Sequence, residues 1–573
     1  MIKQIHFFTI AALSLAVSAC SVIPPKAQTP IAVPNVPLDK NFEVLDQETI
    51  SVPQRPSLAG LRWQDFYADP KLKQLIQMGL EHNKDLEQAI LAIQSAKAKY
   101  QITSAGGLPT VGASAGVTRS AGGRDQNPST AYNVGLAMSS YELDFWGKVA
   151  NSKEAALHDF LATNAAKDAA QISLISNIAQ TYVNLSYALA QRHLAKETLK
   201  TREHSLMITK KRFSAGIDSR SPSLQAEASL ESAKISIYEA DTNILQLKNA
   251  LQLLIGKPIP KELMPEMAVA NITTQTIFQT GLPSELLYYR PDIVQAEHAL
   301  RAAGANIDVA RAAYFPSISL SSNIGYSSSH LKDLFNSSAF GWSFGPSISL
   351  PIFDAGSRRA NYEVAEVAQK SALAAYEKTI QTAFKEVNDV LANRATLGQR
   401  LDSQYRLQKN YQQTYDIAYA RFRSGLDDYL NVLDAERSLF ANQQGILSLE
   451  QQKIISQIEL YQRLGGGASL TAEQIAEFHQ QREAMKTANL ATLADIANQK
   501  IQIEDEKLQL TQTKPDNIRV LEPKNVAGVA NPEVQSVQSE ANQSQNAMFQ
   551  SATQADVQTD VQTDVSMPPN KSE

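Results

Sequence analysis

Two stretches of this sequence repeat each other at a fixed spacing, and this repeat constrains the fold more than any other feature. Arg212–Asp218 reads RFSAGID, and Arg421–Asp427, 209 positions later, reads RFRSGLD. The same offset joins four further identical pairs: Leu224 and Leu433, Ala226 and Ala435, Glu227 and Glu436, and Leu230 and Leu439. An ungapped internal repeat predicts that the chain contains two copies of one structural unit.

Residues 71–104 and 290–313 form a second pair of related segments. Their shared residues lie 207 positions apart: Asp85 and Asp292, Ala89 and Ala296, Ala96 and Ala303, and Pro109 and Pro316. Apolar residues at helical spacing predict that 71–104 is one amphipathic helix. It would begin after Asp69-Pro70, because proline is favoured at the first helical position, and would end before Gly106-Gly107.

Each of these helices leads into two segments in which apolar residues alternate with small or polar ones. The alternating residues are Val111, Ala113, Ala115 and Val117, then Tyr132, Val134, Leu136 and Met138 in the first unit, and Ile318, Leu320, Ile324 and Tyr326, then Trp342, Phe344, Ile348, Leu350 and Ile352 in the second. Weakly hydrophobic alternation over about 10 residues is typical of outer-membrane strands. We predict hairpins over 108–145 and 315–354, with two soluble hairpins as the alternative.

These four predicted strands suggest how the chain would cross a membrane. No apolar run reaches the roughly 18 residues that a spanning helix needs, so a mature chain that crosses a bilayer must do so as a closed β-barrel. Small barrels need about eight strands. Several chains would therefore have to combine.

Long helices are predicted after each hairpin. The expected helices cover 148–215 and 222–255 in the first unit, and 357–424 and 428–464 in the second. The segment 357–424 contains no proline and one glycine, Gly398, and at 1.5 Å per residue it would extend about 100 Å. The glycine turns 212–218 and 421–428 would join the two helices of each unit.

The N-terminus is typical of a lipoprotein. Lys3 precedes an apolar run, and Val17-Ser18-Ala19-Cys20 resembles a bacterial lipobox. We predict a signal peptide over 1–19 and acylation of Cys20, where each buried methylene would contribute about 0.8 kcal/mol to membrane binding. The alternative is an ordinary signal peptide followed by an incidental cysteine. The proline-rich residues 20–57 would form an acylated, extended leader.

The remaining segments divide the chain further. The two repeats are predicted over 58–256 and 284–467, joined by a proline- and threonine-rich linker over 257–283. Residues 468–511 have a polar helical pattern. Residues 512–573 are rich in Gln, Asn, Ser, Thr and Pro, a composition that buries too little apolar surface to fold alone, so we predict a disordered tail.

Several functional classes are disfavoured by composition. A formal net charge of −5 predicts no basic surface for nucleic acid. The eight histidines include no HExxH or HxxxH pair, and no GxxxxGK[ST] phosphate loop is present. The single cysteine is assigned to lipidation. We therefore predict no catalytic residues, no metal site and no cofactor beyond the lipid on Cys20, so the chain should not be an enzyme.

An ordered set of motifs resembles one family. These motifs are the lipobox, FWGK at Phe145–Lys148, LPIFDAG at Leu350–Gly356, RFRSG at Arg421–Gly425, YLNVLDAERSLF at Tyr429–Phe440 and LYQRLGGG at Leu460–Gly467. Together they resemble the TolC-like outer-membrane efflux channels, in the lipoprotein (OprM/NodT-type) branch found in tripartite RND pumps. The resemblance covers roughly residues 20–467.

The resemblance implies a fold class and an assembly. It implies a mixed membrane β-barrel plus α-barrel, in which a homotrimer forms one 12-stranded outer-membrane barrel and a long periplasmic helical barrel. An equatorial belt would collect the N-terminal region, residues 257–283 and the segment after Gly467. The implied partners are a periplasmic adaptor (membrane fusion) protein, an inner-membrane RND transporter and outer-membrane lipid.

The resemblance also implies a pore gate at Leu430, Asp434 and Arg437. Their spacing of four and three residues places them on one helix face. Three leucines would form an apolar ring, and Asp434 with Arg437 would form an ionic lock within or between chains. The alternative is an ordinary surface pair worth less than about 1 kcal/mol. At the 209 offset the first unit has Ser221, Gln225 and Ala228, so only the second unit would supply the gate.

The two glycine turns are implied to be adaptor-contact tips. The residues concerned are Arg212, Gly216, Arg421 and Gly425. The glycines would permit tight turns, while the arginines would either cap the carbonyls of the helix ends or contact the adaptor.

The function implied is a passive, gated exit duct of a multidrug efflux system, located in the outer membrane, lipid-anchored and extending into the periplasm. An exit channel for type I protein secretion or for metal efflux is an alternative within the family. A structural periplasmic coiled-coil lipoprotein is the alternative from another class.

Overall fold

The structure is a computed structural model that describes residues 61–121, 128–274 and 289–467. Several predictions concern residues outside these ranges: the signal peptide 1–19, acylated Cys20, the leader 20–57, the linker residues 275–283, the polar helical segment 468–511 and the tail 512–573. The described residues contain both copies of the repeated unit.

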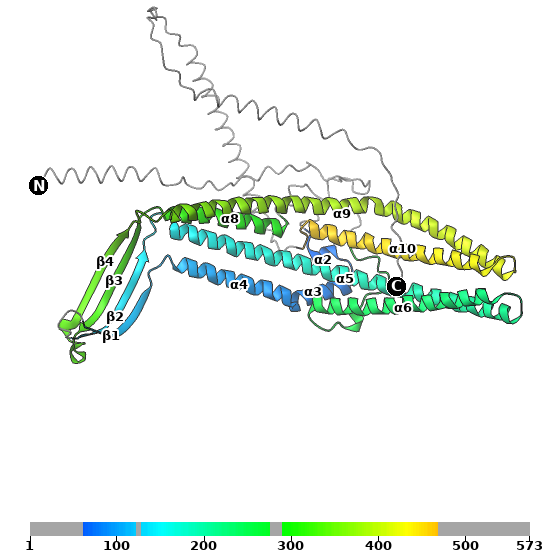
Figure 1. The fold of residues 1–573 in the computed structure, drawn as a ribbon, viewed down its shortest axis with the longest axis horizontal. Coiled ribbons are helices and arrows are strands. Elements are labelled where there is room, and N and C mark those ends of the chain that lie inside the picture. Colours follow the sequence, from blue (N-terminus) through cyan, green and yellow to red (C-terminus); the bar gives the residue numbers. More distant parts are fainter. Residues whose placement is uncertain (1–60, 122–127, 275–288, 468–573) are drawn as a thin grey trace, which may run out of the picture. The chain divides into compact units, whose positions relative to one another are not determined.

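The strands form one antiparallel sheet in the order β1-β2-β3-β4 (Figure 1). Their bounds are Val111–Ser120 for β1, Ser129–Glu142 for β2, Ser317–Ser328 for β3 and Phe340–Ser349 for β4. The register places alternating apolar residues opposite one another, as in Val117 against Tyr132 and Ile324 against Trp342. The predicted hairpin strands are therefore confirmed, except that Leu350 and Ile352 lie beyond the end of β4. Pairing of β2 with β3 joins the two hairpins.

The described residues of the first repeat form five α-helices. They are α2 Trp63–Phe66, α3 Pro70–His82, α4 Lys84–Ala105, α5 Lys148–Ser214 and α6 Arg220–Ile255. Asp69 begins α3 as expected, since its carboxylate accepts hydrogen bonds from the backbone N–H groups of Lys71 and Leu72. The long helix α5 is 67 residues long.

The prediction of one helix over 71–104 is wrong, because the chain breaks at Asn83. Asn83 has an extended backbone conformation, with φ −65° and ψ 130°. Its side chain accepts a hydrogen bond from the N–H of Leu86 and donates one to the carbonyl of Leu254. Asn83 thus caps α4 and fastens the break to the end of α6.

The second repeat follows the same plan. Its helices are α8 Pro291–Ala312, α9 Ser357–Arg423 and α10 Tyr429–Arg463, and short 3-10 turns lie between β3 and β4 at η6 Leu331–Asp333 and η7 Ser337–Ala339. A further 3-10 turn, η4 Lys261–Leu263, lies in the linker between the repeats. α5 packs against α4, α6, α8 and α10, and α9 packs against α8 and α10. In the described part of the chain, no helix combines the length and the apolarity needed to cross a membrane.

Two separate apolar cores hold the helices together. The larger one includes Phe66 and Tyr461, whose rings stack at 3.9 Å between centroids. The smaller one, here called the tip core, is formed by Ala226, Ala418, Phe422, Tyr429, Val432, Leu433 and Ala435. The tip core joins α6, α9 and α10 near the two glycine turns, and partly buried Leu206 and Ile208 add α5 to it.

Candidate functional site

The two glycine turns have the same backbone geometry. Gly216 and Gly425 both have φ +73°, a left-handed conformation that glycine adopts without strain. The N–H groups of Ile217 and Leu426 each donate to the carbonyl of an arginine five residues earlier, both at 2.9 Å. This is a Schellman ending, in which the turn itself satisfies the last helical carbonyls.

Each turn also contains a bidentate ion pair between an arginine and an aspartate. In the first, Arg212 Nε lies 2.6 Å from Asp218 Oδ2 and Arg212 Nη2 lies 3.0 Å from Oδ1. In the second, the corresponding distances from Arg421 to Asp427 are 2.7 and 2.9 Å. The arginine hydrogen bond lowers the pKa of both aspartates, although partial desolvation opposes this.

These pairs correct the expectation that the arginines cap the helix ends. The guanidinium groups hold aspartates, while backbone N–H groups take the carbonyls. The two arginines also differ in exposure. The side chain of Arg212 is 19% exposed and lies 5.0 Å above the ring of Phe422 in the second repeat. The side chain of Arg421 is 51% exposed, so the second tip presents its cation to the surroundings.

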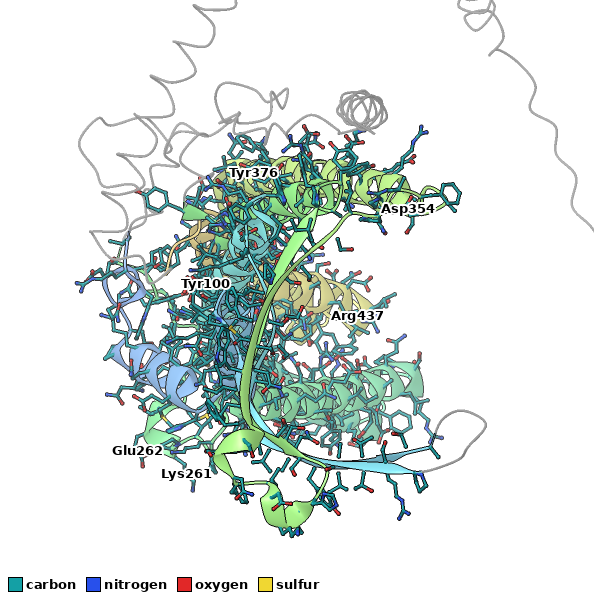
Figure 2. The ribbon with its side chains drawn as sticks, turned by 90° about the vertical axis from the view of Figure 1, so that its left-hand side faces the viewer. Tyr100, Lys261, Glu262, Asp354, Tyr376 and Arg437 are labelled. Carbon is teal, nitrogen blue, oxygen red and sulfur yellow. The ribbon has the colours of Figure 1, made fainter. Side chains whose placement is uncertain are left out.

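Leu430, Asp434 and Arg437 lie together on an exposed face of α10, here called the gate face. Leu430 is 49% exposed, whereas Tyr429 and Val432 beside it are buried. Figure 2 shows Arg437 projecting on the side of the helices away from Lys261 and Glu262. The predicted shared face is thus present, while its role in gating stays a prediction.

Asp434 and Arg437 form no ion pair with each other within the described residues. The spacing of three along the helix allows such a pair, but both side chains remain exposed. Both charges therefore face the surroundings of the helix.

Sequence reasoning missed the most buried charges of this region. Arg202 of α5 and Glu436 of α10 form an ion pair with Nε and Oε1 2.6 Å apart, and each side chain is 6% exposed. The sequence identifies Glu436 only as a repeated position. A usable signal did exist, because Glu436 falls in the apolar phase of α10 with Val432, Leu433 and Leu439.

A second cluster of titratable groups lies between α5 and α8. The Nδ1 atoms of His158 and His298 are 3.2 Å apart. Burial lowers the pKa of both imidazoles. For His298, burial acts together with the nearby His158 and Arg301 and lowers the pKa to about 4. Among the described residues, no group of three or more His, Cys, Asp or Glu side chains is placed to hold a metal ion.

Known proteins resemble nearly the whole described part of the chain. The sequence profile of the family described as outer membrane efflux protein matches residues 75–257 and 282–466. The cation efflux system protein CusC of Escherichia coli O157:H7 is 38% identical over 457 residues, which are 79% of this chain and 97% of that protein. The toluene efflux pump outer membrane protein TtgF of Pseudomonas putida is 39% identical over 474 residues, 81% of this chain and 97% of that protein.

A solved structure gives the same result for the fold. The open state of the Neisseria gonorrhoeae MtrE outer membrane channel is 37% identical, has a TM-score of 0.69, and is matched over 78% of this chain and 98% of its own. The predicted family, fold class and outer-membrane location are confirmed, and the alternative of a structural coiled-coil lipoprotein is set aside. These relatives are transport proteins rather than enzymes. The chain therefore belongs to the outer membrane efflux protein family, and it is the outer-membrane channel component of an efflux system.

Proposed function

We propose that three copies of this chain form the gated exit duct of a tripartite multidrug efflux system. An inner-membrane RND transporter would deliver cargo through a periplasmic adaptor, and the duct would release it across the outer membrane without consuming energy itself. The observation that carries this proposal is the incomplete sheet. β1 and β4 are the two edges of the four-stranded sheet, and each offers unpaired backbone groups to a further strand.

Side-chain exposure on the sheet supports closure within a membrane. Alternate residues of β4 are large, apolar and exposed, with Trp342 at 74%, Phe344 at 61% and Ile348 at 72%. Val117 of β1 and Leu136 of β2 are exposed in the same way. An outward apolar band that alternates with small or polar residues suits contact with lipid. Three sheets joined edge to edge would provide twelve strands.

The helices also have apolar faces that the single chain leaves uncovered. α6 presents an exposed apolar stripe at helical spacing, formed by Leu224, Ile235, Tyr238, Leu245 and Leu253. α9 presents Val364 and Val367 near its first end and Ile417 near its last. Exposed apolar stripes such as that of α6 mark interaction surfaces. We assign them to packing between neighbouring copies, which would continue the trimer along its helical part.

The gate would be formed by the gate face of α10 from each of the three chains. Three copies of Leu430 would narrow the pore with an apolar ring. Asp434 and Arg437 are unpaired with each other in one chain, so they are available for ion pairs between chains. This arrangement would use the second repeat only.

The two glycine turns would contact the adaptor. Gly216 and Gly425 hold both turns in a fixed shape, and the apolar side chains of Phe213, Ile217 and Leu426 beside them are 45%, 64% and 67% exposed. Arg421 adds an exposed cation, and Arg212 braces the first turn against the second. A rigid apolar tip with polar surroundings is a suitable surface for a helical partner.

The membrane anchor would be a lipid on Cys20, with palmitate among its acyl chains. The support is the sequence Val17-Ser18-Ala19-Cys20, since these residues lie outside the described ranges. More than one acyl chain gives stable anchoring.

The cargo class follows from the resemblance to the drug-pump branch, so we propose drugs and other small organic compounds, with antibiotic resistance as the phenotype. Efflux of cations is the second candidate, because one relative is named a cation efflux system protein. Type I protein secretion remains a further alternative within the family.

Complementation tests the proposed function. A strain that lacks this channel but keeps the co-encoded pump and adaptor would be transformed with the wild-type chain, a variant carrying Pro at Val134 in β2, or an empty plasmid. We expect the wild type to restore resistance to drugs and dyes, and the strand variant to fail because proline removes a backbone donor from the sheet. Unchanged susceptibility with normally inserted wild-type protein, using each pump in turn, would overturn the proposal.

A further inference from the structure

A buried ion pair joins the two repeats at the tip core. Arg202 Nε of α5 donates to Glu436 Oε1 of α10 at 2.6 Å, and Arg202 Nη1 donates to the carbonyl of Ser229 in α6 at 2.8 Å. Each of the two charged side chains is 6% exposed. One guanidinium group therefore holds α10 and α6 to α5.

Glu436 also influences a residue of α9, the fourth helix that contributes to the tip core. The charge of Glu436, together with the larger effect of burial, raises the pKa of Tyr415 in α9 and of Tyr429 in α10 to about 12. Arg202 also lies 5.8 Å from the ring centroid of Phe440. Within the described residues, Glu436 Oε2 has no hydrogen-bond partner. Among the described residues of α5, α6, α9 and α10, Arg202 is thus the single ionic partner of Glu436.

The position of Glu436 in α10 connects it to the gate face. Asp434 and Arg437 lie two residues before it and one residue after it, but they are exposed where Glu436 is buried. Residues of one helix turn move together, so a rotation or shift of α10 that moves the gate face also moves Glu436. The pair spans 2.6 Å, and a displacement of roughly 1.5 Å or more would take it beyond the 4 Å limit of an ion pair.

The repeat provides a natural comparison. At the 209 offset, Tyr411 stands where Arg202 does, and Glu227 stands where Glu436 does. Glu227 instead lies 3.6 Å from Lys210, and these side chains are 50% and 55% exposed. The buried pair is therefore not a general product of duplication. It occurs on the helix that carries Leu430, Asp434 and Arg437.

We propose that Arg202 and Glu436 are positioning residues for the gate, that their buried pair holds α10 against α5 and α6, and that this arrangement of α10 is the closed one. This inference rests on the proposed function, since it needs a gate to position. Removal of one charge leaves the other buried and unpaired, which is strongly unfavourable. The closed arrangement of α10 is the arrangement that would lose stability.

The test is the conductance of full-length trimers in planar bilayers. We expect Glu436→Gln to raise the open fraction about tenfold or more, because breaking a buried pair destabilises the state that buries it. The charge swap Arg202→Glu with Glu436→Arg restores a pair and should return conductance toward the wild-type value. The matched control is Glu227→Gln, which alters the exposed counterpart and should leave conductance unchanged.

A folding readout accompanies each measurement. Trimer content on gels and the helical melting curve show whether a variant assembles, and should Glu436→Gln not assemble, Arg202→Gln breaks the same pair from its other side. Wild-type conductance in an assembled Glu436→Gln or Arg202→Gln trimer would overturn the inference. An equal increase in Glu227→Gln would also overturn it.

The double variant Asp434→Ala with Arg437→Ala separates the two proposals. If it opens the channel while Glu436→Gln does not, the proposed function stands and the positioning role is wrong. If the wild-type chain forms no conducting trimer even with its adaptor, the proposed function itself is wrong.

Discussion

Asp434 and Glu436 are two residues apart in α10, but one side chain is exposed and the other is buried, so we expect different roles for them. Glu436 is buried against Arg202, and loss of one partner leaves an isolated charge in the tip core. Asp434 is exposed and has no ion pair with Arg437 in the described residues. The buried charge can stabilise the tip of one chain, and the exposed charge is free to act between chains.

The gate face yields the first prediction. Asp434→Ala combined with Arg437→Ala should raise single-channel conductance, because the proposed ion pairs between chains are lost. The melting temperature should change little, since exposed pairs contribute less than about 1 kcal/mol. The control is Lys385→Ala with Asp389→Ala, which removes an exposed pair from α9. Unchanged conductance in the gate variant would contradict the assignment of Asp434 and Arg437.

The glycine turns yield the second prediction. Replacement of Gly216 or Gly425 by valine should weaken adaptor binding, because valine at φ +73° is strained by at least about 1–2 kcal/mol. The strain is in the backbone, since a Cβ at either position meets no atom within 4 Å. Binding is measured by pull-down with the purified adaptor. Gly398→Ala in α9, where a Cβ also meets nothing, is the control, and normal capture of both valine variants would refute the tip assignment.

The helices and strands show what periodicity can and cannot predict. Alternation in β1–β4 predicted which residues of a strand share one face, because successive side chains in a strand point to opposite faces. The long helices α5 and α9 followed from the absence of proline. The break at Asn83 could not be predicted in this way, because the hydrogen bond from Asn83 to Leu254 joins residues 171 positions apart. The Arg202–Glu436 pair, 234 positions apart, was missed for the same reason.

The contact between α5 and α8 yields the third prediction, on pH. The folded-state pKa of His158 and His298 is lowered by burial, and nearby Arg301 lowers both further, while Glu154, Glu297 and Asp159 partly oppose this at His158. The unfolded chain therefore binds more protons between about pH 4 and the ordinary histidine value near 6.5. Stability should fall as the pH falls through this window.

Melting curves at pH 7.5 and pH 5 measure this effect. The wild type should melt at a lower temperature at pH 5, and His298→Gln should show a smaller difference between the two conditions. An equal difference in the variant would show that other groups cause the acid sensitivity.

At the scale of the whole molecule, the described residues of one chain leave the sheet edges and the α6 stripe uncovered. Both kinds of surface indicate an oligomer in which neighbouring copies extend the sheet and cover the helices. The family match assigns the chain the role of a channel. The two repeats contribute different parts of that channel. Both repeats supply a hairpin and a tip, whereas the second alone supplies Leu430, Asp434 and Arg437.

Disulfide trapping between β1 and β4 tests the trimeric duct most directly. In one chain β2 and β3 separate these edges, so a bond between them must join different copies. Ser114→Cys would be combined in turn with Ser343→Cys, Gly345→Cys and Ser347→Cys, positions that the register places on the same face. Ser114→Cys alone is the control.

After oxidation in intact outer membranes, we expect at least one pair, but not the control, to give bands at two and three chain masses and none beyond. A chain that stays monomeric with every pair, or that forms a ladder longer than three, would contradict the trimeric duct.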